Sequence, residues 1–479
     1  MNYTEAIQSE LKKGDRLAVE RKQEALKGKS TQTILNELLS QIKPVDFQDQ
    51  SNQGNDGKIA RKLYVIITID KIKETATLNN WGLCTRNGFI YVFNGKYWQV
   101  VSVDDFKPFL AEAAKKMGVP AIEAKYFQFK DDLYKQFLSE SNLPTLETKR
   151  NTLINLLNGT FDFSSEGKQE LREHRREDFL KYQLPFEYNP DADCPLFYRY
   201  LNRVLVDEDC QKVLAEYLGY LFINDLKLEK ALILFGYGAN GKSVLFDIVN
   251  AILGEENICS YSLQNLTKPD GYQRAELANK LLNYCSEING KLDASIFKQL
   301  TSGEQVEARQ IYGKPFIMRE YAKLAFNCNE LPKEVEQTHA FFRRFIIIPF
   351  DQTIPESEQD PALSKKIIQT ELSGVFNWIL EGLKRLLKQE KFTGSVVVKQ
   401  QLEDYRRESD SVTMFFDEEG YQPTVDDWIP YKTVYIEYRT YCTENGYRSC
   451  SAKTFSERLK RTGFQTKRNN QGNVIYAKK

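Results

Sequence analysis

The chain has 479 residues, which predicts about three domains at roughly 150 residues each, every one large enough to bury its own core. It carries 66 Lys and Arg against 66 Asp and Glu, so a basic nucleic-acid footprint must be local. The eight cysteines form no CxxC pair and only two histidines accompany them, which argues against a structural zinc and for reduced thiols. No apolar run approaches the roughly 18 residues of a membrane span, and the N-terminus lacks an apolar signal segment. The sequence therefore predicts a soluble, cytoplasmic protein with no membrane partner.

The pattern along the chain predicts a multidomain α/β protein. Residues 1–60 suggest a helical arm and a polar linker. Residues 61–185 mix β-like runs, such as LYVIITI (63–69) and FIYVFNGKYWQVV (89–101), with helical stretches, and predict an N-terminal α+β accessory domain. The other expected parts are a helical collar at 186–230, a motor at 231–350, a helical segment at 351–423 and a basic tail at 424–479.

The clearest motif is GYGANGKS at 236–243, a G-x-x-x-x-G-K-S pattern between the apolar run ALILF and an amphipathic helix. Its glycines allow a tight turn that aims backbone N–H groups at phosphate oxygens, at the positive end of the helix. The lysine is expected to reach the β- and γ-phosphates of ATP, and the serine to reach Mg²⁺. A chance Gly-rich turn is the alternative, and the order of strand, loop and helix argues against it. The expected nucleotide-binding residues are Gly236, Gly238, Asn240, Gly241, Lys242 and Ser243.

Two further strands are expected beside this loop. The run LLNYCSEI (281–288) predicts a strand ending at Glu287, whose carboxylate could polarise the attacking water and help to hold the metal. The preceding residue is Ser286 and not an acid, which leaves metal coordination partly unassigned, and a plain surface glutamate is the alternative. The run AKLAFNCN (322–329) ends in Asn329, whose amide could orient water against the γ-phosphate, unless it is only a turn residue.

Paired arginines precede a strongly apolar strand in HAFFRRFIIIPF (339–350). Arg344 or Arg343 could act as an arginine finger that reaches the nucleotide of a neighbouring subunit. An ordinary salt-bridging role is the alternative for either residue.

The stretch EARQIYGKPFIM (307–318) predicts a β-hairpin with Gly313 near its tip. Lys314 and Arg309 could neutralise DNA phosphates there, and Tyr312 could stack on a base. Lys298 is a weaker candidate for the same role. A solvated hairpin with ordinary surface charges is the alternative.

The tail predicts a helix from Tyr431, a second helix capped by Ser451, and two strands joined by Asn470-Gln471-Gly472, which is the order of a winged helix. Eleven basic against three acidic side chains over 432–479 give a local net charge of +8. Such a charge on a neutral protein favours DNA binding, although a protein-contact domain with a basic face is the alternative. The basic residues expected to contact DNA are Lys453, Lys460 and Arg461.

Five segments together resemble superfamily 3 helicases in their order and spacing. They are the phosphate-loop motif, the strand to Glu287, the stretch 297–316, the strand to Asn329 and the arginine pair. The chain is similar in particular to the phage and plasmid primase-helicase family, which is related to the poxvirus primase-helicase. This resemblance covers about residues 150–479 and includes the Asn-Gly turn of LLNGTFDF (156–163).

The resemblance implies an AAA+-like motor that uses ATP and Mg²⁺ at subunit boundaries and assembles as a homo-oligomeric, hexameric ring. Such a ring would translocate 3′ to 5′ on single-stranded or forked DNA, with the hairpin in its channel. It would act in replication of a phage, plasmid or other mobile element, in a bacterial host cell or at the replication site of a virus.

The sequence also bears on three other functions. Primase chemistry needs acidic residues clustered for two metals, and only Asp70 hints at them, so a primase or polymerase would be a separate partner. A P-loop kinase or metabolic NTPase would not need Asn329, the arginine pair or the basic tail. An origin-binding initiator that uses ATP as a switch, without processive unwinding, is the remaining alternative.

Overall fold

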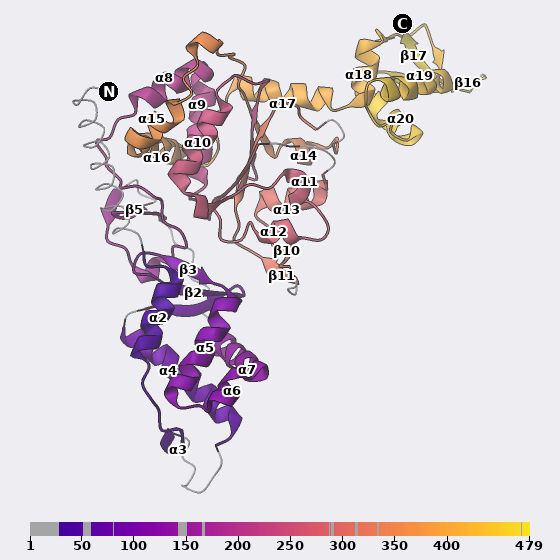
Figure 1. The fold of residues 1–479 in the computed structure, drawn as a ribbon. Helices are drawn as coiled ribbons and strands as arrows, with labels where there is room; N and C mark the ends of the chain where they lie inside the picture. The colour runs from indigo at the N-terminus through magenta and orange to yellow at the C-terminus, as the bar shows by residue number, and fades with distance from the viewer. Residues whose placement is uncertain are drawn as a thin grey trace, which may run out of the picture.

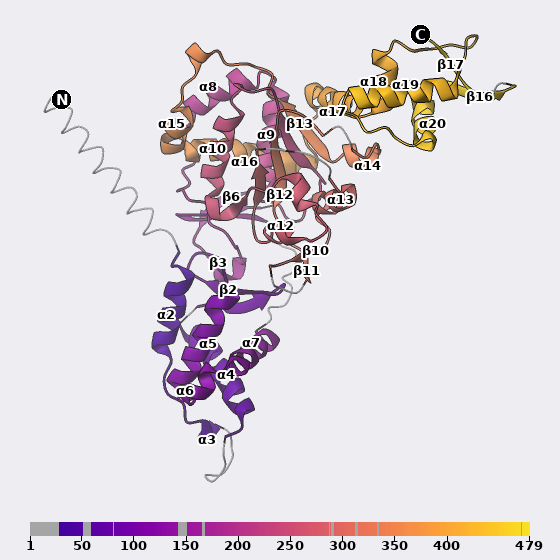
Figure 2. The same cartoon turned by 45° about the vertical axis from the view of Figure 1, so that its right-hand side comes forward.

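The protein is a mixed α/β, multidomain chain in which three units follow one another (Figures 1 and 2). The largest unit is built around a parallel sheet, and α17 (Val396–Glu408) runs from it to the C-terminal unit. Within the described parts of the chain, no helix combines the length and the apolar character that crossing a membrane requires. The computed structural model describes residues 28–50, 59–79, 81–141, 151–164, 168–286, 288, 292–311, 315–332, 335–470 and 472–479.

The N-terminal unit packs helices against an antiparallel sheet in the order β1-β2-β3. Its first described helix is capped by Ser30, whose hydroxyl accepts from the N–H of Thr33, and its buried Ile34 and Leu38 enter the core of this unit. This unit therefore begins before residue 61, where the sequence placed its start. Residues 1–27 of the expected arm lie outside the described residues. The elements are α2 (Thr31–Gln41), α3 (Phe47–Gln50), α4 (Arg61–Leu78), β1 (Leu83–Arg86), β2 (Phe89–Phe93), β3 (Trp98–Val101), α5 (Val103–Met117), α6 (Ala121–Lys125) and α7 (Phe127–Glu140).

The run LYVIITI lies within α4, so the expected β-like run at 63–69 is wrong. Its β-branched residues favour a strand when taken locally. However, Val65, Ile69, Ile72 and Ala76 recur at helical spacing and are all buried in the core of the N-terminal unit. Packing of that face overrides the local propensity.

A second antiparallel sheet consists of β4 (Thr152–Leu156), β5 (Gly159–Phe163) and β6 (Gln169–Arg172). Its buried Ile154 and Phe161 belong to the core of the central unit, not to the N-terminal one. The stretch expected to form one accessory domain is therefore divided between two cores.

The collar helices pack closely on helices that come much later in the chain. A Cβ at Gly382 of α16 would lie 2.3 Å from the carbonyl carbon of Ala215 in α9, so only glycine allows this approach. The carboxylate of Glu371 accepts hydrogen bonds from the N–H groups of Leu196 and Phe197 at the start of α8. The helices expected around 194–223 and after 361 are thus present, and they form one layer: α8 (Pro195–Val204), α9 (Glu208–Tyr220), α15 (Leu363–Thr370) and α16 (Leu372–Gln389).

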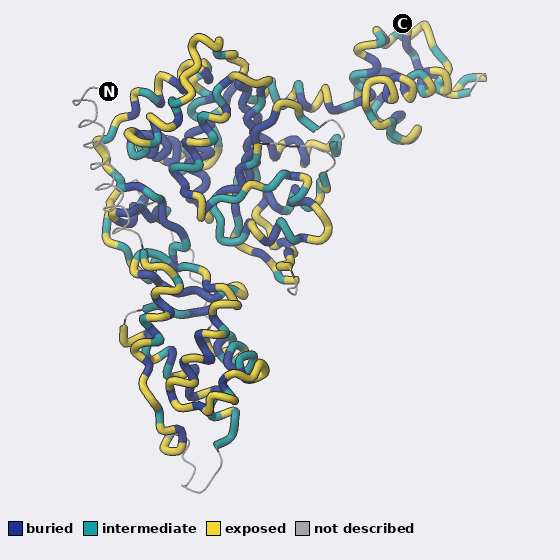
Figure 3. Tube along the Cα trace, viewed as in Figure 1, coloured by how far each residue is buried: buried dark blue, intermediate teal, exposed yellow. Residues whose placement is uncertain are grey.

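Five parallel strands form the central sheet, in the order β13-β7-β12-β9-β8. Along β7, Leu232 and Leu234 face the core shared with the collar, whereas Ala231 and Ile233 face the opposite core. Figure 3 shows these strands as a buried band. The elements of this part are β7 (Ala231–Phe235), α10 (Lys242–Leu253), η2 (Glu255–Asn257), β8 (Ile258–Cys259), α11 (Leu263–Leu266), α12 (Tyr272–Ala275), β9 (Leu282–Cys285), α13 (Ala294–Ser302), β10 (Val306–Arg309), β11 (Pro315–Met318), β12 (Lys323–Cys328), α14 (His339–Phe342) and β13 (Phe345–Pro349).

The C-terminal unit contains the two helices and two strands that the sequence predicts, including the cap at Ser451. Its core also takes in Val412, Phe415 and Phe416, so it begins near residue 411 and not at 424. Two short strands that the sequence did not indicate extend its sheet. The elements are α18 (Ser411–Glu418), β14 (Gln422–Pro423), β15 (Ile429–Pro430), α19 (Tyr431–Glu444), α20 (Ala452–Arg461), β16 (Gln465–Asn469) and β17 (Gly472–Lys478).

Candidate functional site

The Gly-rich loop at 236–241 joins β7 to α10 at the carboxyl end of the parallel sheet. A Cβ at Gly236 would lie 2.4 Å from the carbonyl oxygen of Phe350, so this position has no room for a side chain. Gly241 has a left-handed backbone (φ +86°), and a Cβ there would also lie 2.8 Å from Val204. The loop is therefore shaped by its glycines and is packed against the collar and the end of β13.

Lys242 is the first residue of α10 and is buried. Its Nζ donates hydrogen bonds to the carbonyl oxygen of Gly236 at 2.5 Å and to Oδ1 of Asn240 at 3.1 Å. Burial lowers the pKa of Lys242, and no described carboxylate lies within ion-pair distance of it. A buried cation that is held only by neutral oxygens favours the approach of an anion. Ser243 follows on the exposed side of the same helix turn, where its hydroxyl is free of the core.

Asn240 has a definite structural role in the loop. Its buried side chain accepts from Lys242 and donates from Nδ2 to the carbonyl oxygen of Phe350 at 3.0 Å. It therefore ties the lysine to the segment that follows β13. The sequence indicated Asn240 only as a member of the loop, because its partner is distant along the chain.

Asn329 lies next to the loop. The N–H of Gly236 donates to the carbonyl oxygen of Cys328 at 3.0 Å, and the exposed Asn329 follows directly. The strand β9 pairs with β12, with Cys285 opposite Phe326, so the chain leaves β9 at the same edge of the sheet. Glu287 follows β9 but lies outside the described residues, and its role stays a prediction.

The arginine pair lies at the opposite edge of the sheet. The carbonyl oxygen of Arg344 accepts from the N–H of Ala231 at the start of β7, whereas the loop follows the end of that strand. Arg344 is 7% exposed, and its guanidinium donates to Ser302 at 2.9 Å and to the carbonyl oxygen of Ala340. Arg343 is more exposed and pairs with Glu229. These contacts favour a structural role for Arg344 and leave Arg343 as the more accessible of the two.

The expected hairpin is confirmed by the antiparallel pairing of β10 with β11, in which Arg309 lies opposite Pro315. Arg309 is exposed, with its guanidinium 5.9 Å from the ring of Tyr272. Tyr312 and Lys314, which the sequence placed near the tip, lie outside the described residues. At the base, Phe316 packs edge-on against Phe89 of the N-terminal unit, with 5.7 Å between ring centroids.

Lys298, the weaker candidate for DNA contact, is paired within the protein. It lies on α13 and forms an ion pair with Glu336 at 3.0 Å, so its charge is already matched. The sequence could not indicate this pair, because the two residues are brought together by the fold.

The basic side chains of the tail fall into two groups. Arg458 pairs with Asp410 at 3.2 Å, and Lys479 pairs with Glu419 at 2.6 Å, so both act within the unit. Lys453, Lys460 and Arg461 are exposed on α20, although Arg461 also makes a long contact of 3.4 Å to the carbonyl oxygen of Gln337. Lys453 and Lys460 are two helical turns apart and share a face.

The fold and this loop define a multidomain α/β protein with a candidate anion site at the carboxyl edge of a parallel sheet. Three sequence families match the chain: "D5 N terminal like" over residues 71–206, a "Family of unknown function (DUF5906)" over 234–344, and "Poxvirus D5 protein-like" over 407–477. Two of these three models are of the D5 type, and they support the resemblance to D5-like primase-helicases that the sequence motifs indicated.

Individual relatives are distant. "Putative helicase 121R" of Invertebrate iridescent virus 3 is 23% identical over 337 residues, which cover 60% of this chain and 34% of the relative. A protein of Acanthamoeba polyphaga mimivirus that is also named a putative helicase is 24% identical over 230 residues, 46% of this chain and 24% of the relative. This chain thus spans about a third of the length of the iridescent virus protein and about a quarter of the length of the mimivirus protein. The solved C-terminal region of NrS-1 is 13% identical with a TM-score of 0.47, and the match covers 84% of this chain and 97% of that one.

Proposed function

We propose that this chain is the ATP-driven motor of a DNA helicase of superfamily 3, with an AAA+-like P-loop site. The observation that carries the proposal is the position of Lys242, which is buried at the start of α10 and held across a tight Gly-rich loop by neutral oxygens. A phosphate in this loop would meet backbone N–H groups, the positive end of the helix and the lysine charge together.

The remaining catalytic parts would gather at the same edge of the sheet. ATP would bind with its phosphates in the loop and with Mg²⁺ held by the hydroxyl of Ser243 and by Glu287. Asn329 would orient the attacking water, since it follows the strand whose last residue is bonded to Gly236. Mg²⁺ would neutralise the developing charge on the phosphoryl group.

A ring of identical subunits would complete the site. Arg343 and Arg344 lie at the amino edge of the sheet, away from the loop of their own chain, so a finger there would serve only a neighbouring copy. Arg343 is the better candidate because it is the more exposed. Such a ring, taken as hexameric, would move 3′ to 5′ along one DNA strand.

Two surfaces would contact DNA. The hairpin of β10 and β11 would present Arg309, Lys314 and Tyr312 to a single strand in the channel. The C-terminal unit would act as a winged helix, with the exposed Lys453 and Lys460 of α20 on duplex or forked DNA. A separate primase or polymerase would use the strand that the motor releases.

Unwinding of labelled forked DNA with and without ATP tests the proposal. We expect ATP-dependent strand separation by the full chain and none by Lys242→Ala at the same oligomeric state. ATP hydrolysis without unwinding would favour an ATP-switched initiator that binds an origin. Absence of ATP hydrolysis by the intact protein in the presence of DNA and Mg²⁺ would overturn the assignment of the loop.

A further inference from the structure

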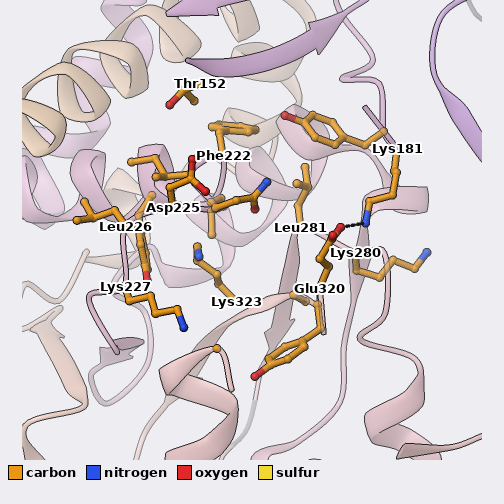
Figure 4. Close-up of a pocket in the computed structure, with 18 of the residues that line it drawn as sticks. Thr152, Lys181, Phe222, Asp225, Leu226, Lys227, Lys280, Leu281, Glu320 and Lys323 are labelled. Carbon is orange, nitrogen blue, oxygen red and sulfur yellow. Dashed lines mark hydrogen bonds and ion pairs between the residues drawn. The ribbon is translucent and has the colours of Figure 1, made fainter. Parts of the chain in front are cut away.

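A cavity of about 650 Å³ lies at the amino edge of the parallel sheet, the edge opposite to the Gly-rich loop. Its floor includes Leu281, the residue just before β9, and Lys323, the first residue of β12. The end of the collar with Phe222 and Asp225, and the start of β4 at Thr152, form other walls (Figure 4). The volume falls in the range of about 300–1,000 Å³ that is usual for small-molecule sites.

Lys323 points into the space between Asp225, Leu226 and Leu281 (Figure 4). Its amine lies 3.9 Å from the centroid of the Tyr220 ring. Burial lowers the pKa of Lys323 to about 8, and no carboxylate in the described ranges lies within ion-pair distance of it. The cavity therefore contains a half-buried amine without a matched negative charge.

The rest of the lining leaves a surplus of positive charge. Lys181 pairs with Glu320 at 2.5 Å, and this ion pair is visible at one side of the cavity (Figure 4). Lys227 and Arg319 are exposed at the cavity, and no ion pair links either to a described carboxylate. In total, seven Lys and Arg line the cavity against four Asp and Glu. The surplus favours an anionic ligand.

The cavity also offers apolar surface next to these charges. Phe222 and Leu226 lie on the collar side and Leu281 on the sheet side, all within the lining (Figure 4). A ligand that suits this combination has a flat apolar part and an anionic group, since apolar walls with a few placed polar groups select such molecules.

We propose that this cavity is a second nucleotide site, in which Lys323 holds the phosphate of a nucleoside monophosphate unit and the apolar wall holds its base. The unit could come from a free mononucleotide or from the end of a DNA strand, because both present the same chemistry. The site is separate from the Gly-rich loop, which lies at the other edge of the sheet, and it does not depend on the motor function.

Equilibrium dialysis of the full chain in a Lys242→Ala background tests this site, with labelled AMP as one probe and a 5′-labelled dithymidylate as the other. We expect about one bound nucleotide unit per chain. Adding Lys323→Met, which keeps an unbranched apolar stem, should weaken binding about tenfold or more, because a charged hydrogen bond to the phosphate is lost. Lys399→Met, on the exposed face of α17, is the matched control and should change nothing. The probe that binds more tightly identifies the source of the ligand.

The outcomes separate this site from the proposed motor. The cavity site is overturned if the Lys242→Ala chain binds neither probe, or if it binds them equally well with and without Lys323→Met. If the intact protein still hydrolyses ATP in that case, the motor assignment stands. If binding depends on Lys323 while the intact chain hydrolyses no ATP, the motor assignment falls and the cavity site stands.

A second measurement covers the case in which Lys323→Met does not fold. An amine-reactive ester at pH 8 should label Lys323 in the otherwise intact chain, because its lowered pKa leaves much of the amine neutral. Bound AMP or dithymidylate should reduce that labelling several-fold, as followed by mass spectrometry, and leave Lys399 unchanged. Equal labelling of Lys323 with and without both probes would contradict the proposal.

Discussion

The Oδ1 of Asn240 accepts a hydrogen bond from Nζ of Lys242 at 3.1 Å, while Nδ2 of the same asparagine donates to the carbonyl oxygen of Phe350 at 3.0 Å. The buried asparagine thus connects the lysine of the Gly-rich loop to the chain just after β13. Since the arginine pair directly precedes β13, one strand links the two proposed halves of the catalytic site.

Asn240 should therefore position Lys242 without touching phosphate. We expect Asn240→Ala to raise the KM for ATP about tenfold, which corresponds to a loss of roughly 1.4 kcal/mol in the free energy of ATP binding. The change in kcat should be smaller. Steady-state ATPase kinetics measure this split. An Asn240→Ala enzyme with unchanged KM would show that the hydrogen bond does not order the lysine.

Lys242 should carry the charge that stabilises the transferring phosphoryl group. We expect Lys242→Ala to lower kcat by about 10² or more, the scale seen when a preorganised donor is lost. Circular dichroism should show a folded chain, because the substitution also removes a buried charge that burial disfavours. ATPase activity of Lys242→Ala within a few-fold of the intact protein would contradict the loop as a nucleotide site.

Arg343 and Arg344 should behave differently when truncated. Arg344→Ala should lower the melting temperature, because it leaves the buried Ser302 without its partner and removes one of the two arginines that pair with Glu229. Arg343→Ala should leave stability nearly unchanged yet abolish ATPase. Mixing Arg343→Ala subunits with Lys242→Ala subunits should restore part of the activity, since some interfaces then combine an intact loop with an intact finger. No recovery in verified mixed oligomers would make Arg343 structural as well.

The boundary of the C-terminal unit predicts two different truncations. A chain ending at residue 409 should remain soluble, whereas one ending at 423 should aggregate, because it leaves Val412, Phe415 and Phe416 without their core. The chain that ends at residue 409 should also bind duplex DNA more weakly, and its affinity should depend less on salt concentration, because phosphate contacts release counterions. Fluorescence anisotropy across a salt series measures both. An unchanged salt slope would assign the unit to protein contacts.

The hairpin should couple ATP turnover to DNA. We expect Lys314→Ala and Arg309→Ala to retain ATP binding and oligomerisation but to lose most DNA-stimulated hydrolysis and unwinding, because each subunit repeats the phosphate contact at every step. Lys298→Ala is the matched control, since Glu336 already neutralises that lysine. Wild-type rates for both hairpin variants would show that the hairpin does not hold DNA.

The sequence by itself determined the features that depend on neighbouring residues. The glycines before Lys242, the serine cap at Ser451 and the pairing of β10 with β11 depend on short-range signals, and the structure has each of them where the sequence indicated. The resemblance to D5-like primase-helicases followed from the order of these signals along the chain, and two D5-type family matches support it.

Only the tertiary structure decided what depends on distant residues. The β-branched run at 63–69 is helical in α4, because Val65 and Ile69 lie on one face of the helix and are buried in the core of the N-terminal unit. The tertiary structure also paired Lys298 with Glu336 and buried Arg344 against Ser302. In each case the deciding partner lies far along the chain, and its contribution to the free energy exists only once the fold has brought the two together.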